Sequence, residues 1–302
     1  TQEVVDTFQL SMNGKKVIAP LHVGFAYTKP LAVVGNILDK ENGYLTLLST
    51  ATRRPIDIVE ISCPGARDAM FNMDDSKIFT TCQQEPKGMA VIDVEARKEI
   101  KMVPIKGGRA GGMDPQGKYF MVSASKSVHF FDSQTAELVK TIKVPGGGGN
   151  FTCLKDGSKC YVGLRKANAV GVIDMAKLEL MKTIETGPDA NRLYLNPGNS
   201  RYGLFANEAG KSDIVSIIDT QLDVKVKDIW TGLGPHNVAF DPDGKFAVIS
   251  TKKENVATLV DTGSADPNDW DVITTDLDSG IQNNGVRWVP SPAALKKALA
   301  QN

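Results

Sequence analysis

The chain has 302 residues, of which 41% are apolar and 23% are charged, as in an ordinary globular protein rather than a disordered one. Lysine plus arginine equals aspartate plus glutamate at 35 each, so the basic field that nucleic-acid binding needs is missing. No apolar run reaches the roughly 18 residues of a membrane-spanning helix. The chain begins at Thr1 without a segment resembling a signal peptide, as a processed or trimmed chain would.

The first predicted elements lie before residue 62. Residues 4–19 hold the tight-turn signal Met12-Asn13-Gly14-Lys15 between two apolar-rich runs, which is typical of a β-hairpin. Three short apolar segments follow at 31–36, 44–49 and 56–61. They predict the second, third and fourth strands of a four-stranded unit.

Two marks then recur along the chain. An aspartate closes an apolar run of strand type at positions 93, 132, 174, 219 and 261, with spacings of 39, 42, 45 and 42 residues. A tight-turn pair begins at positions 74, 116, 156, 198 and 243, with spacings of 42, 40, 42 and 45 residues. Because the two series keep step, they indicate a repeated structural unit.

The chemistry of both marks fits antiparallel hairpins. Pairs such as Asp156-Gly157 and Asp243-Gly244 tolerate the positive φ of short hairpin turns. An aspartate at a strand end accepts hydrogen bonds from backbone amides two or three residues on. Four strands in about 42 residues is typical of a β-propeller blade. Leucine-rich solenoids have a shorter period, and helical repeats need a 3.6-residue periodicity that is absent.

The carboxyl-terminal end adds one strand and a tail. Residues 285–289 read as a strand, and residues 291–302 as a short helix in which Ser291 is the N-cap and Pro292 the first helical residue. We expect the two ends of the chain to combine into a seventh blade, which closes the ring and removes open sheet edges. The prediction is therefore an all-β fold, a single seven-bladed β-propeller of four-stranded antiparallel blades over residues 1–302. Six blades plus an appended hairpin is the alternative.

Residues 232–245 read Gly-x-x-Pro-His-x-x-x-Phe-x-Pro-Asp-Gly-Lys and are followed by Leu259-Val260-Asp261. This pattern resembles the YVTN family of propeller repeats, which is similar to the propeller of cytochrome d1 nitrite reductases and to propeller subunits of periplasmic redox enzymes. The resemblance covers roughly residues 30–275. It implies the fold much more strongly than any activity, because one fold hosts many functions.

The four cysteines are at positions 63, 82, 153 and 160, with no CxxC or CxxCH spacing, which excludes covalent haem attachment and zinc knuckles. Counting outward from the Asp156-Gly157 turn, Cys153 faces Cys160, close enough for a disulfide. Cys63 precedes one unit and Cys82 ends that unit's second strand, so both lie on one face. We expect disulfides 63–82 and 153–160, which point to the periplasm or the extracellular space; four free thiols are the alternative.

The repeat register also places a set of side chains on one face of the propeller, around the channel mouth. We expect these residues to bind a ligand or a partner: Arg67, Arg109, Arg165, Arg192, His236, Asn237 and Lys252. Such a cationic set would suit a small anion, a haem propionate or an acidic partner loop. The alternative is that a channel mouth is wet and polar in any case.

His236 is the candidate metal ligand, because the d1-type propellers that the repeat resembles use histidine to bind haem iron. One histidine makes a poor metal site alone, and similar repeats carry Gly-x-x-Pro-His without a metal. The glycine runs at 107–112 and 145–149 precede strands rather than helices, which excludes a phosphate loop. No catalytic residues are predicted, and whether the chain is an enzyme is left open.

The predicted function is a non-catalytic binding or scaffold propeller, a subunit of an extracytoplasmic redox or haem-protein complex. The models, by fold analogy, are the propeller subunits of quinohaemoprotein amine dehydrogenase and hydrazine synthase. No cofactor is expected in this chain, although a partner subunit could carry haem, and a c-type cytochrome is the expected kind of partner. The alternatives are a propeller that itself holds a haem-like or anionic group, and a secreted or surface interaction protein.

Overall fold

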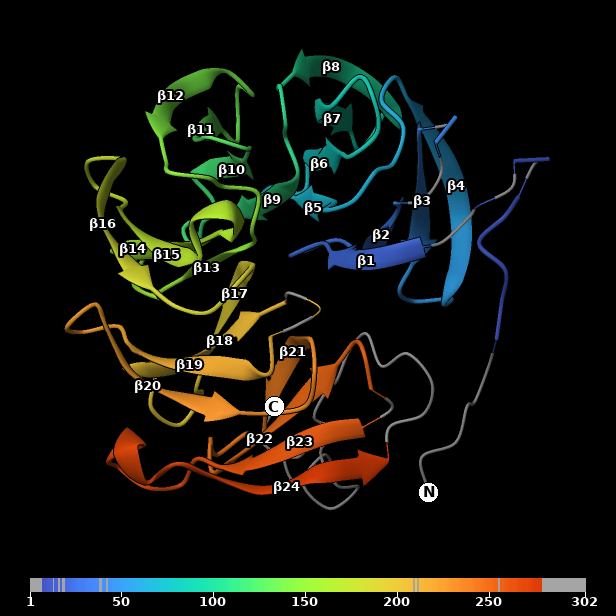
Figure 1. The fold of residues 1–302 in the computed structure, drawn as a ribbon. Helices are drawn as coiled ribbons and strands as arrows, with labels where there is room; N and C mark the ends of the chain where they lie inside the picture. The colour runs from blue at the N-terminus through green and yellow to red at the C-terminus, as the bar shows by residue number, and fades with distance from the viewer. Residues whose placement is uncertain are drawn as a thin grey trace. The chain divides into compact units, whose positions relative to one another are not determined.

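The computed structural model describes residues 7–278 except 13, 16, 18, 19, 38, 39, 42, 209, 211 and 255. These residues form 24 strands in six four-stranded antiparallel sheets (Figure 1), with two 3-10 helices, η1 (Arg165–Ala167) and η2 (Pro267–Asp269). The chain divides into two compact units, Thr1–Gly157 and Ser158–Asn302. No helix among the described residues is long and apolar enough to cross a membrane.

Every sheet takes its strands in chain order. The first sheet comprises β1 (Pro20–Phe25), β2 (Leu31–Asn36), β3 (Gly43–Ser49) and β4 (Arg54–Ile61). The second comprises β5 (Met70–Phe71), β6 (Lys77–Cys82), β7 (Gly88–Asp93) and β8 (Lys98–Pro104). The third comprises β9 (Ala110–Met113), β10 (Tyr119–Ser123), β11 (Ser127–Asp132) and β12 (Leu138–Lys143).

The remaining sheets have the same plan. The fourth comprises β13 (Phe151–Cys153), β14 (Lys159–Leu164), β15 (Ala169–Asp174) and β16 (Glu179–Glu185). The fifth comprises β17 (Ala190–Leu195), β18 (Tyr202–Asn207), β19 (Ile214–Asp219) and β20 (Val224–Trp230). The sixth comprises β21 (Pro235–Phe240), β22 (Phe246–Thr251), β23 (Val256–Asp261) and β24 (Asp271–Asp278).

The recurring aspartates end the third strand of their sheets, as predicted: Asp93, Asp132, Asp174, Asp219 and Asp261 close β7, β11, β15, β19 and β23. Each accepts backbone hydrogen bonds from the turn that follows. Asp132 Oδ1, for example, accepts from the amides of Gln134 and Thr135, both at 2.8 Å. The aspartate therefore ends one strand and shapes the turn into the next.

The second recurring mark, the tight-turn pair, lies between the first and second strands of its sheet, and we call this the first turn of the sheet. In four of the five turns the pair holds a residue of positive φ, such as Gly117 at 67° and Gly244 at 70°, and the pair Gly198-Asn199 does not. A Cβ on Gly117 would lie 1.8 Å from Met73 Cγ, in the preceding sheet's first turn, and one on Gly244 would lie 1.8 Å from Asn196 Oδ1. At Gly117 and Gly244, successive first turns therefore pack so closely that only glycine fits.

In the second sheet, Asp75 takes the place of that glycine. Its φ is 55°, and its carboxylate accepts from the backbone amides of Tyr27, Thr28 and Lys29 in the first turn of the first sheet at 2.7 to 3.0 Å. A carboxylate that receives several N–H donors is stabilised in its charged form. Hydrogen bonds thus replace close packing at this junction.

Replacing Gly244 with alanine is expected to lower the free energy of unfolding by about 2 kcal/mol or more. About half of that comes from the left-handed backbone, and the rest from the clash with Asn196. Gly14 is the matched control, because its φ is 74° and a Cβ there meets nothing within 4 Å. Chemical denaturation of both variants would contradict this explanation if Gly14→Ala cost as much as Gly244→Ala.

The middle strands of each sheet are buried on both faces, which explains their nearly continuous apolar sequences. In the first unit, Phe79 and Phe120 come from neighbouring sheets, are fully buried and stack with ring centroids 5.1 Å apart. In the second unit, Tyr202 and the buried Trp270 meet edge to face at 6.0 Å. Burying one such ring stabilises the fold by about 2 to 3 kcal/mol.

The predicted strands at 31–36, 44–49 and 56–61 correspond to β2, β3 and β4, and β1 is the first strand of that sheet. The hairpin signal near residue 13 is present as a two-residue bridge, in which the backbone amides of Met12 and Lys15 donate to each other's carbonyls at 3.2 and 3.0 Å. The described residues form six sheets rather than seven. Because 285–289 and 291–302 lie outside the described residues, the seventh blade and the helical tail stay predictions.

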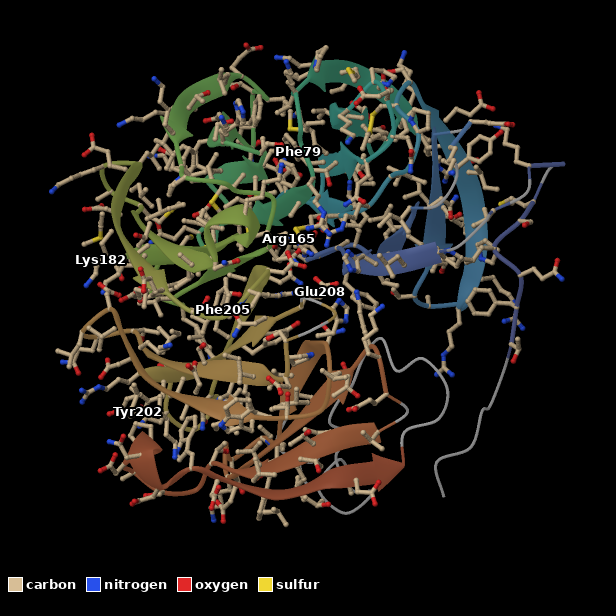
Figure 2. The ribbon with its side chains drawn as sticks, in the orientation of Figure 1. Phe79, Arg165, Lys182, Tyr202, Phe205 and Glu208 are labelled. Carbon is tan, nitrogen blue, oxygen red and sulfur yellow. A yellow bond between two sulfur atoms is a disulfide. The ribbon has the colours of Figure 1, made fainter. Side chains whose placement is uncertain are left out.

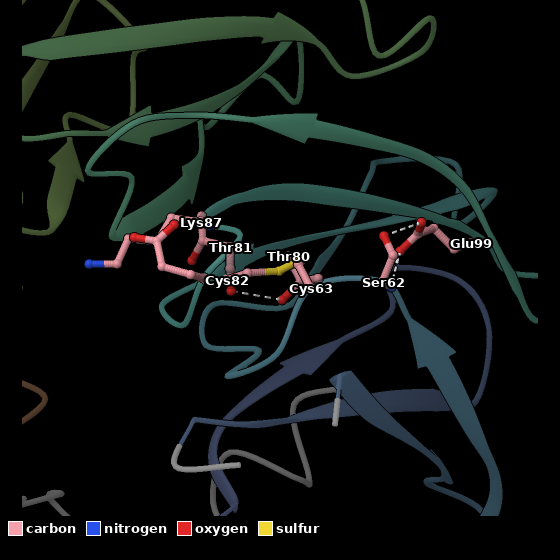
Figure 3. The surroundings of a disulfide bond; sticks show 8 residues. Ser62, Cys63, Thr80, Thr81, Cys82, Lys87 and Glu99 are labelled. Atoms are coloured by element: carbon pink, nitrogen blue, oxygen red, sulfur yellow. Dashed lines mark hydrogen bonds between the residues drawn. A yellow bond between two sulfur atoms is a disulfide. The ribbon is translucent and has the colours of Figure 1, made fainter. Parts of the chain in front are cut away.

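Both predicted disulfides are confirmed. Cys63 follows β4, Cys82 ends β6, and their sulfurs are bonded with Cα atoms 5.7 Å apart (Figure 3). Cys153 and Cys160 are disulfide-bonded as well, and no described cysteine is free. Beside the first bond, Ser62 donates through its backbone N and its hydroxyl to Glu99 on β8, at 2.8 and 2.7 Å, so the loop between β4 and β5 is fixed at two adjacent residues.

Candidate functional site

The first unit contains a buried network centred on Asp68. Arg67 Nη1 donates to Asp68 Oδ2 at 2.7 Å, and the backbone N of Gly111 donates to the same oxygen at 2.9 Å. His22 Nδ1 lies 2.5 Å from Asp68 Oδ1. Arg67 Nη2 also donates to Asn150 Oδ1 at 3.1 Å. The predicted site residue Arg67 is thus held inside the protein by a carboxylate and an amide.

The carboxyl group of Asp68 is ionised in this network. Burial acts to raise its pKa, but the Arg67 guanidinium, the His22 ring and the Gly111 amide together hold the pKa of Asp68 below its usual value. The side chains of Arg67 and Asp68 are only 9% and 5% exposed. The Asp68 network reaches β1 through His22 and β9 through Gly111, and it leaves little of Arg67 for an outside ligand.

Arg109 lies two residues before Gly111, and its guanidinium also bonds another part of the chain. Its Nη1 donates to the carbonyl of Gly148 at 2.9 Å. The two glycine runs singled out in the sequence therefore meet through this contact between Arg109 and Gly148.

The second unit contains a similar network around Glu208, the residue after β18. Arg165 Nη1 donates to Glu208 Oε2 at 2.7 Å, and both residues are labelled in Figure 2. Arg165 Nη2 bonds Asp189. Lys252 Nζ bonds Glu208 Oε1, and His236 Nε2 lies 3.4 Å from that oxygen. Three of the predicted binding residues thus converge on one carboxylate.

Burial acts to raise the pKa of Glu208, but His236, Lys252 and Arg165 lower it to about 2. The Glu208 side chain is 10% exposed, so solvent screens these charges little. Counting Asp189, the two fixed cations of the network are balanced by two carboxylates. Of the cationic residues predicted at the channel mouth, Arg165 and Lys252 are therefore neutralised within this unit, and Arg192 is not part of the network.

Glu208 makes folding stability depend on pH in a specific window. Its folded pKa of about 2 lies below the ordinary 4.5, so its contribution is present above pH 4.5 and is lost as the pH falls through 2. We expect Glu208→Gln to lower the free energy of unfolding by up to about 3 kcal/mol at pH 7. Urea titrations should show the gap between wild type and variant closing between pH 4.5 and 2. A gap of constant size would contradict the assignment.

Arg192, His236 and Asn237 belong to the first strands of the fifth and sixth sheets. Arg192 lies over the Tyr194 ring at 5.3 Å, and Tyr194 Oη donates to Asn237 Oδ1 at 2.6 Å. Asn237 Nδ2 is 3.0 Å from His236 Nδ1. The register of β21 against β22 shifts between Pro235 and Val238, and such a bulge re-aims the two side chains that it contains.

Sequence reasoning missed the carboxylates of these networks. Asp68 was given no role, and Asp189 and Glu208 were not singled out. Glu208 directly follows β18, whose end the repeat register places near the channel mouth. The register does not show which cations reach Glu208. His22 at the bulge in β1 was likewise not considered a site residue.

No group of three or more histidine, cysteine, aspartate or glutamate residues in the described part of the chain could hold a metal ion. The described neighbours of the His236 ring include the Glu208 carboxylate at 3.4 Å and the side-chain amide of Asn237 at 3.0 Å. The assignment of His236 as a metal ligand stays a prediction.

Comparison with solved structures identifies the fold. The chain is similar to hydrazine synthase of Kuenenia stuttgartiensis, with 16% identity, a TM-score of 0.65 and 93% of each chain covered. It is also similar to the β-propeller domain of Myceliophteria thermophila Cps50 (Swd1), with 14% identity, a TM-score of 0.67 and 91% of each chain covered. A functionally unknown protein from Desulfotomaculum acetoxidans is 13% identical with a TM-score of 0.62, over 82% of this chain and 79% of that one. No family model and no curated protein matches. The chain thus has a β-propeller fold.

Proposed function

We propose that this chain is a non-catalytic binding propeller that serves as a subunit of an extracytoplasmic redox or haem-protein complex. The observation that carries the proposal is that Arg67, Arg165 and Lys252 bond carboxylates of the chain itself. Arg165 and Lys252 join neighbouring sheets through Glu208, and Arg67 bonds Asn150 as well as Asp68, so these contacts give the protein a rigid frame. A rigid frame with its basic groups engaged suits a protein that presents surfaces to partners.

Two further observations support the compartment and the kind of assembly. Two disulfides fit an oxidising environment, which favours a periplasmic or extracellular place. The likeness to a hydrazine synthase chain favours a hydrazine synthase-like or amine dehydrogenase-like assembly, with haem carried by a partner such as a c-type cytochrome. In this proposal the chain has no cofactor of its own.

The proposal includes a seventh blade of the YVTN type, made by the two ends of the chain. Within the first unit, Arg54 of β4 lies over the Phe8 ring at 5.4 Å, and Lys15 Nζ is 2.9 Å from Glu60 Oε1. The amino-terminal segment therefore runs beside the last strand of the first sheet. This is the place that an outer strand of a closing blade would take.

The test is to purify the chain from the cells that produce it and to record its visible spectrum and its co-eluting proteins. Stoichiometric co-elution with a cytochrome, with no chromophore left on the separated chain, would support the proposal. A chromophore that stays on the separated chain and is lost in His236→Ala would instead establish a cofactor-binding propeller. A colourless, unaccompanied protein on the cell surface would establish an interaction protein.

A further inference from the structure

An open groove of roughly 670 Å³ lies in the second unit, where the loop after β20 faces β23 and β24. Its walls include Thr231, Leu233 and Val256, and its three ionisable lining residues are Asp213, Glu254 and Asp276. A volume of this size holds one or two long side chains of a partner. The groove does not include any residue of the Glu208 network.

Hydrogen bonds to the loop after β20 hold the Glu254 carboxylate and the backbone of Asp213. Glu254 Oε2 accepts from the backbone N of Leu233 at 2.8 Å, and a Cβ on Gly232 would lie 2.4 Å from that oxygen. The carbonyl of Asp213 accepts from the backbone N and the hydroxyl of Thr231 at 2.6 and 3.1 Å. The loop after β20 is thus tied to both residues, so the groove keeps its shape without a ligand.

Among the described residues, no basic side chain forms an ion pair with these carboxylates. Of the two lysines that precede Glu254 in sequence, Lys252 bonds Glu208 and the Lys253 side chain lies against Gly210. The described residues that line the groove therefore carry a net negative charge. Such a charge attracts cations and repels acidic surfaces.

We propose that this groove binds a lysine- or arginine-rich segment of the partner protein. The alkyl stem of a long basic side chain would lie on Leu233 and Val256, and its charged end would reach the three carboxylates. Arginine suits the site best, since its planar fork bonds carboxylates through two N–H groups. This inference deepens the proposed binding function and rests on it.

The test uses the full chain and a fluorescein-labelled hexa-arginine peptide, with binding followed by fluorescence anisotropy at low salt. The triple variant Asp213→Asn, Glu254→Gln, Asp276→Asn is expected to bind the peptide about tenfold more weakly than wild type. The control variant Glu95→Gln, Glu185→Gln, Asp243→Asn removes three exposed carboxylates outside the groove, which changes net charge equally. It should bind as wild type does.

Equal weakening in both triple variants would overturn the groove as the site, because it would show a general charge effect. So would unchanged binding in the groove variant, provided that its thermal unfolding matches wild type. Co-purification distinguishes failure of the groove proposal from failure of the proposed function. A partner retained equally by wild type and groove variant overturns only the groove, whereas the absence of any partner overturns the binding proposal.

Discussion

Replacing Asp223 with alanine is expected to lower the free energy of unfolding by about 3 kcal/mol, the usual cost of removing one partner from a buried charge pair. Asp223 lies between β19 and β20 and is 8% exposed. Lys159 Nζ is 2.7 Å from its Oδ2, and Tyr161 Oη donates to its Oδ1 at 2.6 Å. Both donors come from β14, so this carboxylate joins the fourth and fifth sheets.

The loss would leave Lys159 without its counter-charge and Tyr161 with one acceptor, the Thr220 carbonyl. Burial first, and then Asp223, raise the pKa of Tyr161, so the phenol stays protonated and donates. Urea denaturation measures the effect. Lys177→Ala serves as the control, because that side chain is 72% exposed in its pairing with Asp174 and should cost less than about 0.5 kcal/mol.

Backbone strain at Asp223 needs a separate variant. Its φ is 54°, a conformation that asparagine tolerates better than alanine. Asp223→Asn should therefore lose the ion pair with little added strain and lie between wild type and Asp223→Ala. If the asparagine variant were as stable as wild type, the ion pair would contribute nothing and the explanation would be wrong.

Removing the Cys63–Cys82 disulfide is expected to cost about 3 kcal/mol. The bond closes a loop with a sequence separation of 19, and restricting a loop of that size in the unfolded chain gives roughly this stabilisation. Both cysteines are fully buried, so alanine is a better replacement than serine, whose hydroxyl group would be buried without a partner. Chemical denaturation of Cys63→Ala/Cys82→Ala under non-reducing conditions measures the effect.

The second disulfide provides the comparison. Cys153 and Cys160 are seven positions apart, a smaller loop whose closure stabilises by about 2.5 kcal/mol. The double alanine variant at 153 and 160 should therefore unfold at a somewhat higher denaturant concentration than the variant at 63 and 82. The reverse order would show that the loop-entropy argument does not describe these bonds.

The repeat was predictable because its marks are local. An aspartate at a strand end and a glycine in a tight turn are each favoured by the conformation of the few residues around them. Asp132 and Gly117 therefore give the same signal in sequence and in structure. The interlock of Gly244 with Asn196 was not predictable, since its partner lies 48 residues away. The same holds for Glu208, whose cations come from three separate segments.

The register predicted which residues lie at the inner strand ends but not how their charges combine. Arg165 and Lys252 looked like a cationic surface because their carboxylate partners, Asp189 and Glu208, were not singled out in the sequence. Pairing between sheets depends on side-chain reach, which a one-dimensional alignment of units does not contain. A single sequence therefore indicates well where a residue lies in the repeat, but it indicates poorly which opposite charges will neutralise that residue.

The two kinds of turn have different consequences for anyone who wishes to attach a reporter to this protein. The first turns pack against one another, so an insertion at Gly117 or Gly244 would push neighbouring sheets apart. In the turns that follow the strand-ending aspartates, only the tip is exposed, as at Gln134 and Thr135, whose backbone amides bond Asp132. An epitope or a cysteine for spin labelling belongs there, where the chain tolerates a detour.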